Sequence, residues 1–263
     1  MIFSYYPGCT LSAKAQKLDI YARESADVLG FYLEEIDNWQ CCGAVYPLGT
    51  NEVASKLPVI RALKAANDKE RPLVTLCSAC HHVFKRINDD MKHNADLRNI
   101  VKNYDDNLIY SGETEVLHYL EVIKLHIGFD KLKQLVQNPL RGRKIGAYYG
   151  CMLLRPSDVM MFDDPENPTI IEEFLRALGA APVPFAYRNE CCGGYISLKQ
   201  GEKAAQMVNK IVVNAADKGA DMLVTACPLC QYNISQKSEK DLPILYFTEI
   251  LAEALGVKDG EAY

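Results

Sequence analysis

Ten cysteines fall into two sets with the same internal order, and this repeat constrains the fold more than any other feature. Each set reads as a single cysteine, an adjacent pair and a Cys-x-x-Cys motif. The pair and the motif recur after 150 residues, and the single cysteine after 142. The sets are Cys9, Cys41, Cys42, Cys77 and Cys80, then Cys151, Cys191, Cys192, Cys227 and Cys230. We therefore predict a duplicated chain, with repeats over 1–140 and 141–263.

The residues around the cysteines repeat as well. Leu-Val-Thr-Leu-Cys at 73–77 matches Leu-Val-Thr-Ala-Cys at 223–227, and both adjacent pairs continue into glycine. The second repeat is eight residues longer between its first cysteine and its pair. The added residues include Asp-Asp-Pro-Glu-Asn-Pro at 163–168. Prolines and Asx residues suit turns, so we expect a loop there.

Short apolar runs alternate with helical patterns in both repeats. This alternation predicts an α/β fold in which each repeat forms a parallel sheet with helices, because parallel strands need helical crossovers. Strands are expected at 2–6, 32–36, 73–76, from 116, 145–149, 182–185, 222–225 and 244–246. Helices of the first repeat are expected at 13–29, 51–66 and 79–90.

The cysteines are predicted to lie just after strands and before helices, where the carboxyl ends of parallel strands gather ligands. Residues far apart in sequence then converge, and helix N-termini face the thiolates. Glycines adjoin the cysteines and permit unusual backbone angles and close approach to a bound group. They are Gly8, Gly43, Gly150, Gly193 and Gly194.

Composition narrows the functional class. The net charge of -5 and pI of about 5.6 argue against a nucleic-acid partner, which requires clustered Lys and Arg. No run approaches the length of a membrane span and no signal-peptide core is visible, so a cytoplasmic location is expected. In a reducing compartment, ten cysteines indicate metal ligands or redox groups rather than disulfides.

Simpler interpretations of the cysteines each leave part of the repeated pattern unexplained. A thioredoxin-like dithiol explains one Cys-x-x-Cys motif but not the adjacent pairs, and a cubane ferredoxin needs a compact cysteine run that is absent. Structural zinc takes four ligands, which leaves one cysteine over in each half. His81 and His82 follow Cys80, but Gln231 and Tyr232 occupy the matching positions, so a solvated or capping role is expected for both histidines. Glu121 and Glu249 recur at predicted helix starts, where a carboxylate caps a helix as readily as it catalyses.

Together these motifs resemble the cysteine-rich CCG domain, and the whole chain is similar to the B-type subunit of heterodisulfide reductase, in a bacterial-type form. The spacing is Cys-x31-Cys-Cys-x34-Cys-x2-Cys in the first set, and the pair-to-motif spacing of 34 recurs in the second. The most specific motifs are Tyr-Pro-Gly-Cys at 6–9, Trp-Gln-Cys-Cys-Gly-Ala at 39–44, Phe-Asp-Asp-Pro-Glu-Asn-Pro at 162–168, Glu-Cys-Cys-Gly-Gly at 190–194 and Cys-Pro-Leu-Cys at 227–230.

The resemblance implies two noncubane four-iron four-sulfur clusters, each held by the five cysteines of one set, with zinc as the alternative in the first site. The clusters are expected to face each other across a pseudo-twofold axis. A small disulfide would be reduced between them, or two thiols oxidised. The resemblance also implies two partners from the same kind of complex, a ferredoxin-like protein of the C type and a flavin-containing protein of the A type. Such partners are needed because this chain has no dinucleotide fingerprint of its own.

Three rival functions stay open at this point. The clusters could only relay electrons within a larger oxidoreductase. The chain could be an accessory protein of a lactate or glycolate oxidase, which also uses the CCG motif. It could be a structural zinc protein. An open pocket between the two cysteine sites would favour catalysis over relay.

Overall fold

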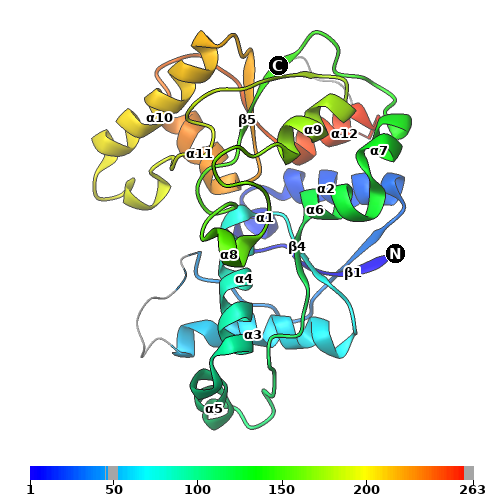
Figure 1. Ribbon diagram of the computed structural model, residues 1–263, viewed down its shortest axis with the longest axis vertical. Coiled ribbons are helices and arrows are strands. Elements are labelled where there is room, and N and C mark those ends of the chain that lie inside the picture. The colour runs from blue at the N-terminus through cyan, green and yellow to red at the C-terminus, as the bar shows by residue number, and fades with distance from the viewer. Residues whose placement is uncertain (45, 47–52, 258–263) are drawn as a thin grey trace.

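Two four-stranded parallel sheets with the same strand order organise the computed structural model, which describes residues 1–44, 46 and 53–257 (Figure 1). The first sheet has the order β2-β1-β3-β4 and the second β6-β5-β7-β8, and every neighbouring pair is parallel. The predicted α/β class with two similar halves is confirmed. The strands are β1 (Ile2–Tyr6), β2 (Tyr32–Glu35), β3 (Leu73–Thr75), β4 (Val116–His118), β5 (Lys144–Tyr148), β6 (Ala181–Val183), β7 (Met222–Thr225) and β8 (Ile244–Tyr246).

Helices follow most strands, as parallel crossovers require. The first half and the connection contain α1 (Cys9–Ala13), α2 (Gln16–Leu29), α3 (Val53–Asp68), α4 (Ser78–His93), α5 (Ala95–Tyr104), α6 (Tyr119–Val122), the π-helix η1 (Ile123–Ile127) and α7 (Phe129–Leu135). The second half contains α8 (Ser157–Met160), α9 (Ile170–Ala177), the 3₁₀ turn η2 (Gly194–Ile196), α10 (Gly201–Asp217), α11 (Pro228–Lys237) and α12 (Phe247–Ala254).

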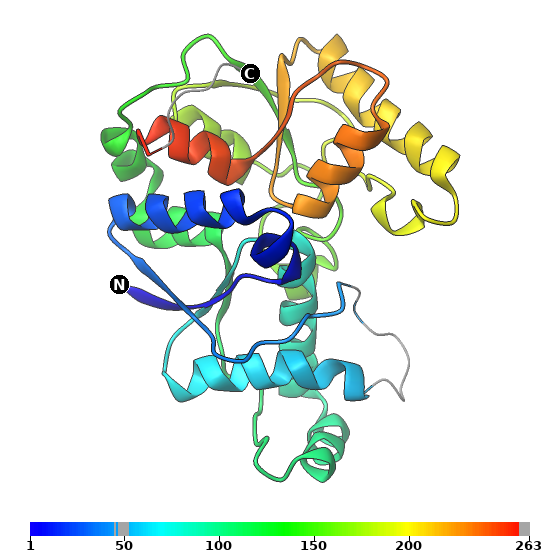
Figure 2. The ribbon, with the colours of Figure 1, turned by 180° about the vertical axis from the view of Figure 1, so that it is seen from behind.

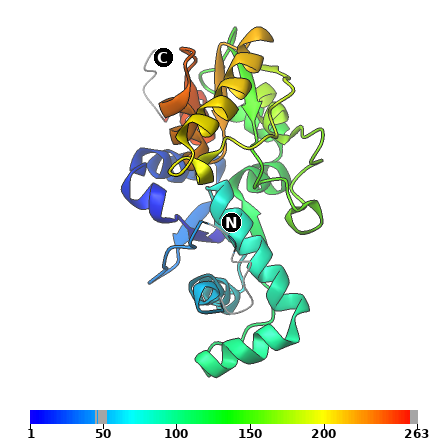
Figure 3. The same ribbon diagram turned by 90° about the vertical axis from the view of Figure 1, so that its left-hand side faces the viewer.

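The predicted helices differ from the observed ones in two places. The helix expected at 13–29 is broken, because Ala15 is not helical and its N–H turns back to the Thr10 carbonyl at 2.9 Å. Helix α5 was not predicted, although Asn94 caps it by accepting a hydrogen bond from Leu97 N at 3.0 Å. It lies at the end of the molecule farthest from the second sheet (Figure 3). Residues 51 and 52, the expected start of α3, lie outside the described residues.

One apolar core joins the two halves. Helix α12 of the second half packs along α2 of the first, and Figure 2 shows them stacked between the two sheets. Thr248 Oγ1 in α12 donates to Leu18 O in α2 at 2.9 Å. Helix α7 also packs on α9 of the second half, although it precedes residue 141. The repeat boundary between 140 and 141 therefore stays a prediction.

Candidate metal centre

The cysteines occupy three kinds of position. Cys9 begins α1, and Cys77 and Cys227 are the N-cap residues of α4 and α11. Cys80 and Cys230 lie in the first turns of those two helices, so helix N-termini adjoin both motifs as expected. The remaining five lie in loops. The expectation of a helix directly after each adjacent pair is wrong for the second pair, where the turn η2 intervenes and α10 begins only at Gly201.

The thiols lie close together within each set. The Sγ atoms of Cys9 and Cys41 are 3.5 Å apart, and those of Cys42 and Cys80 are 3.4 Å apart. In the second set, the Sγ atoms of Cys192 and Cys230 are 3.5 Å apart, and Cys151 interacts with Cys191. The two sets also meet, because the thiols of Cys77 and Cys227 interact across the boundary between the halves. All ten cysteines are free of disulfides.

Side-chain contacts link six of these thiols in one continuous chain, in the order Cys42, Cys80, Cys77, Cys227, Cys230 and Cys192. Over residues 1–44, 46 and 53–257, no three His, Cys, Asp or Glu side chains converge on one point as ligands do around a single ion. A structural zinc ion needs four ligands in a tetrahedron, whereas an iron–sulfur cluster distributes its thiolates over several irons. Each set supplies five thiols, one more than a tetrahedral zinc site takes, so the donor set fits a polynuclear cluster.

A matching hydrogen bond holds the loop before each adjacent pair. Tyr6, at the end of β1, donates to Gln40 O at 2.9 Å, and Tyr148, at the end of β5, donates to Glu190 O at 2.7 Å. Both acceptors directly precede a cysteine pair. A tyrosine at the matched position in each half thus anchors the pair to the end of a strand. The turn that follows Tyr6 needs glycine. Gly8 has a φ of 77°, and a Cβ atom there would lie 3.0 Å from Cys80 Sγ.

The other predicted glycines mostly share this conformation. Gly43, Gly150 and Gly193 have φ values of 81°, 68° and 77°, the left-handed region that side chains rarely adopt. Gly194 begins η2 and is not among the residues with positive φ, but a Cβ atom there would lie 3.5 Å from Cys192 Sγ, so the expected close approach to a sulfur is confirmed.

Main-chain N–H groups point at the sulfurs of the pairs. Gly193 N donates to Cys191 Sγ at 3.3 Å. The pKa of Cys191 is lowered to about 6, chiefly because the Cys151 thiol donates to it and also because Gly193 N does. The pKa of Cys42 is lowered to about 7, chiefly by its hydrogen bond with the Cys80 thiol. Metal ligation requires deprotonated thiols, so these contacts prepare thiolates near neutral pH.

Alkylation of the cluster-free protein tests this difference between matched residues. Burial raises the pKa of Cys41, the counterpart of Cys191, above its ordinary value. We expect Cys191 to react with iodoacetamide with a midpoint near pH 6 and Cys41 with a midpoint above pH 9, although Cys41 is the more exposed. Peptide mass spectrometry across pH 5–10 measures both rates. Equal midpoints would contradict the assigned hydrogen bonds.

The two Cys-x-x-Cys motifs are fastened to each other across the boundary. Ser78 donates to Ala226 O through its N–H at 3.2 Å and its hydroxyl at 2.8 Å. The Tyr246 hydroxyl donates to Leu76 O at 2.5 Å, and His118 Nε2 lies 2.8 Å from the same carbonyl. The anchored carbonyls directly precede Cys77 and Cys227. Residues at the ends of β4 and β8, which are matched strands of the two halves, thus hold the two Cys-x-x-Cys motifs beside each other.

The histidines after Cys80 do not behave as expected. His81 is fully buried and His82 is 7% exposed, so the expected solvated role is wrong for both. They lie on the face of α4 that packs into the core, which sequence matching to α11 did not reveal. Glu121 and Glu249 do cap helices, since their Oε2 atoms accept from His118 N and Tyr246 N, each at 2.7 Å.

The second cysteine set opens into a pocket of about 210 Å³. All five cysteines of that set line it, and so do Ser78 and Ala79 from the first Cys-x-x-Cys motif. Tyr195, Leu198 and Tyr232 also line the pocket and are 47%, 99% and 70% exposed. This pocket therefore includes the space that a group held by the second set would occupy, and it is open to solvent beside the boundary with the first.

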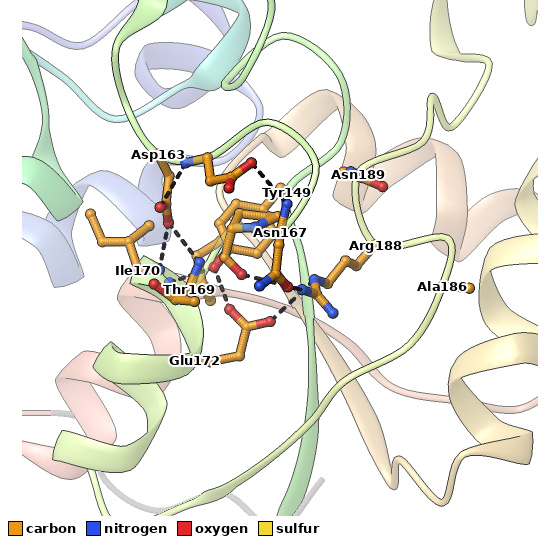
Figure 4. Close-up of polar contacts among 12 residues, drawn as sticks. Tyr149, Asp163, Asn167, Thr169, Ile170, Glu172, Ala186, Arg188 and Asn189 are labelled. Carbon is orange, nitrogen blue, oxygen red and sulfur yellow. Dashed lines mark hydrogen bonds and ion pairs between the residues drawn. The ribbon is translucent and has the colours of Figure 1, made fainter. Parts of the chain in front are cut away.

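The added segment of the second repeat supports the second set (Figure 4). It is a loop, as expected, and Asp163 Oδ2 accepts from Ile170 N at 2.7 Å. Arg188 Nη2 donates to Asn167 Oδ1 at 2.6 Å, and Asn189 Nδ2 donates to Pro165 O at 2.8 Å. Arg188 O in turn accepts from the main-chain N–H of Tyr149 at 2.8 Å. The segment thereby ties together the loops that lead to Cys151 and to Cys191.

Sequence reasoning missed the residues that join the two sets. His118 and Tyr246 lie at matched positions, but nothing in the pattern indicated that both reach carbonyls at the boundary. Tyr195 was detectable as a departure from the repeat, because Cys-Cys-Gly-Gly-Tyr in the second half replaces Cys-Cys-Gly-Ala-Val in the first.

Comparison with known proteins gives a consistent family. The family described as "Cysteine-rich domain" matches residues 3–85 and 145–235. The chain is 32% identical to the 8-methylmenaquinol:fumarate reductase membrane anchor subunit of Wolinella succinogenes, over 97% of this chain and 92% of that protein. It is 26% identical to the B-type subunit of a ferredoxin/F420H2-dependent CoB-CoM heterodisulfide reductase of Methanosarcina acetivorans, over 97% of this chain and 87% of that protein.

A solved structure shares the fold. A hypothetical protein from Helicobacter pylori superposes with a TM-score of 0.76 at 12% sequence identity. The match covers 98% of this chain and 49% of that one, so this chain spans about half of the solved protein. Within its described residues the chain has no helix with the length and apolar character needed to cross a bilayer.

Proposed function

Because the chain belongs to the cysteine-rich domain family, we propose that it is an iron–sulfur subunit of a multi-subunit reductase related to heterodisulfide reductase. The ten cysteines hold two noncubane four-iron four-sulfur clusters, five cysteines to each, and Gly8, Gly43, Gly150 and Gly193 let the main chain come close to them. The clusters supply the redox chemistry, and the chain supplies position and shielding.

The reaction is the reduction of a small disulfide, or the reverse oxidation of two thiols, beside the second set. The pocket carries this proposal, since its wall combines the five thiols of the second set with Ser78 and Ala79 of the first motif. Sulfur is a soft ligand and suits iron that is already rich in thiolates. Catalysis needs an opening at this boundary through which the disulfide can enter. A pure electron relay needs no such opening.

The second candidate is an electron relay in a quinol-linked reductase. The observation that favours it is the 32% identity to a protein named as part of an 8-methylmenaquinol:fumarate reductase, which exceeds the identity to the heterodisulfide reductase relative. In that role the clusters pass electrons from a quinol to a partner, and no sulfur substrate is used.

Either role requires partner chains. We propose a ferredoxin-like protein and a flavin-containing protein as these partners, and anaerobic affinity purification followed by mass spectrometry identifies whichever chains bind. A cytoplasmic location is proposed as well, and fractionation tests it against the membrane attachment that the name of the Wolinella relative describes.

Two assays on anaerobically purified protein separate the candidates. The first mixes dithionite-reduced protein with 2-hydroxyethyl disulfide and measures the thiol product by mass spectrometry. The second mixes oxidised protein with reduced methylnaphthoquinone and follows the reduction of the clusters by electron paramagnetic resonance. Thiol formation above the protein-free rate supports disulfide chemistry. Cluster reduction by the quinol without any thiol formation in the first assay would replace it with the relay.

A further inference from the structure

Tyr195 lies where the two cysteine sets and the pocket meet, and the repeat gives it no counterpart. It belongs to η2, three residues after Cys192, while the matched residue in the first half of the sequence is Val45. Its side chain lines the pocket together with Cys191, Cys192 and Met152. The second cysteine set therefore has a phenol for which the repeated sequence of the first set has no equivalent.

The Tyr195 hydroxyl reaches from one half to the other. It donates to Ala44 O, the carbonyl that follows the first cysteine pair, and it lies 3.1 Å from Met152 Sδ. A thioether is a weak acceptor. Burial raises the pKa of Tyr195, and so do nearby thiolate charges from both sets, of which those of Cys227 and Cys77 act most strongly. The hydroxyl thus stays protonated and remains a hydrogen-bond donor.

The partners of this hydroxyl leave it available to a bound molecule. Of its two acceptors, Met152 Sδ belongs to a residue that lines the pocket and Ala44 O does not, and neither is an ionised group. A sulfur atom that becomes negatively charged is a stronger acceptor than either, because hydrogen bonds to ionised groups are the stronger kind. Rotation about one C–O bond is enough to redirect the hydrogen.

On the basis of the proposed disulfide chemistry, we propose that Tyr195 is a catalytic residue that donates a hydrogen bond to a substrate sulfur in the pocket. Cleavage of R–S–S–R consumes two electrons and two protons and yields two R–SH. A low-potential reductant supplies the electrons, and water supplies the protons. Tyr195 keeps its own proton and stabilises the sulfur on which negative charge develops as the S–S bond breaks. A fixed donor aimed at such a charge lowers the barrier.

The test compares Tyr195→Phe with Tyr104→Phe, a control that removes the hydroxyl of an exposed tyrosine in α5, which is not among the residues that line the pocket. Both variants and the wild type are purified without air and assayed with dithionite and 2-hydroxyethyl disulfide. We expect kcat to fall on the order of 100-fold in Tyr195→Phe, the usual cost of losing one donor to a developing anion, with KM little changed. Tyr104→Phe should keep the wild-type kcat.

Two further readouts distinguish a catalytic role from a structural one. Iron content and the electron paramagnetic resonance spectrum of the reduced protein should be the same in wild type and Tyr195→Phe. The affinity for 2-mercaptoethanol, titrated optically, should fall about tenfold, as expected for a lost hydrogen bond to a charged group. Unchanged kcat and thiol affinity, or a loss of iron, would overturn the role of Tyr195. A wild-type protein that neither turns over the disulfide nor binds the thiol would instead overturn the proposed function.

Discussion

Replacing Cys192 with serine is expected to lower the iron content from about eight to about four per chain, because one four-iron cluster then lacks a thiolate. Cys192 Sγ lies 3.5 Å from Cys230 Sγ, and Asn233 Nδ2 holds the Cys192 carbonyl at 2.7 Å. The side chain is nearly fully buried, and a serine hydroxyl is a poorer ligand for thiolate-rich iron than the sulfur it replaces. Iron analysis and electron paramagnetic resonance of anaerobically purified protein measure the loss.

Cys42→Ser is the matched control for this experiment. It removes the corresponding thiol of the first set, which lies 3.4 Å from Cys80 Sγ. Each variant should keep the spectrum that the other one loses, since the proposed function assigns five cysteines to each cluster. Loss of both clusters from either single variant would contradict independent sites. Full zinc occupancy without iron in the wild type would remove the iron–sulfur interpretation altogether.

Phe247→Ala is expected to lower the free energy of unfolding by about 3–5 kcal/mol, the range for a fully buried phenylalanine. Phe247 is 0% exposed and begins α12. Its ring centroid lies 5.5 Å from that of His118 and 5.8 Å from that of Tyr119, both in the first half, and 6.4 Å from that of Phe174 in the second. Truncation therefore leaves a cavity between the halves that neither half can fill alone.

Thermal or urea unfolding of the cluster-free protein, followed by circular dichroism, measures this change. Leu198→Ala is the control, because Leu198 is 99% exposed and its truncation should change stability by less than about 0.5 kcal/mol. The halves share one core, so Phe247→Ala should shift a single transition. Two separate transitions, with only one of them shifted, would show that the halves unfold independently.

The order of the secondary structure was predictable because each strand carries its own signal. The apolar runs at 222–225 and 244–246 became β7 and β8 without a shift, since parallel strands are buried on both faces and read as continuous apolar segments. Strand β6 covers Ala181–Val183 instead of the predicted 182–185, and it tolerates Pro182 because it is an edge strand. Helix α5 was not predicted. Its sequence signal is the capping residue Asn94, and the alternation of apolar runs and helical patterns takes no account of single capping residues.

The sequence by itself determined the duplication, the α/β class and the ten cysteines, because repeat spacing and strand periodicity are properties of the linear chain. Only the tertiary structure decided that Cys77 and Cys227 adjoin, that His81 is buried and that Tyr195 reaches Ala44. These facts depend on how one half packs on the other through α2 and α12. Packing between repeats is set by shape and by burial over the whole core, and no spacing within a single repeat encodes it.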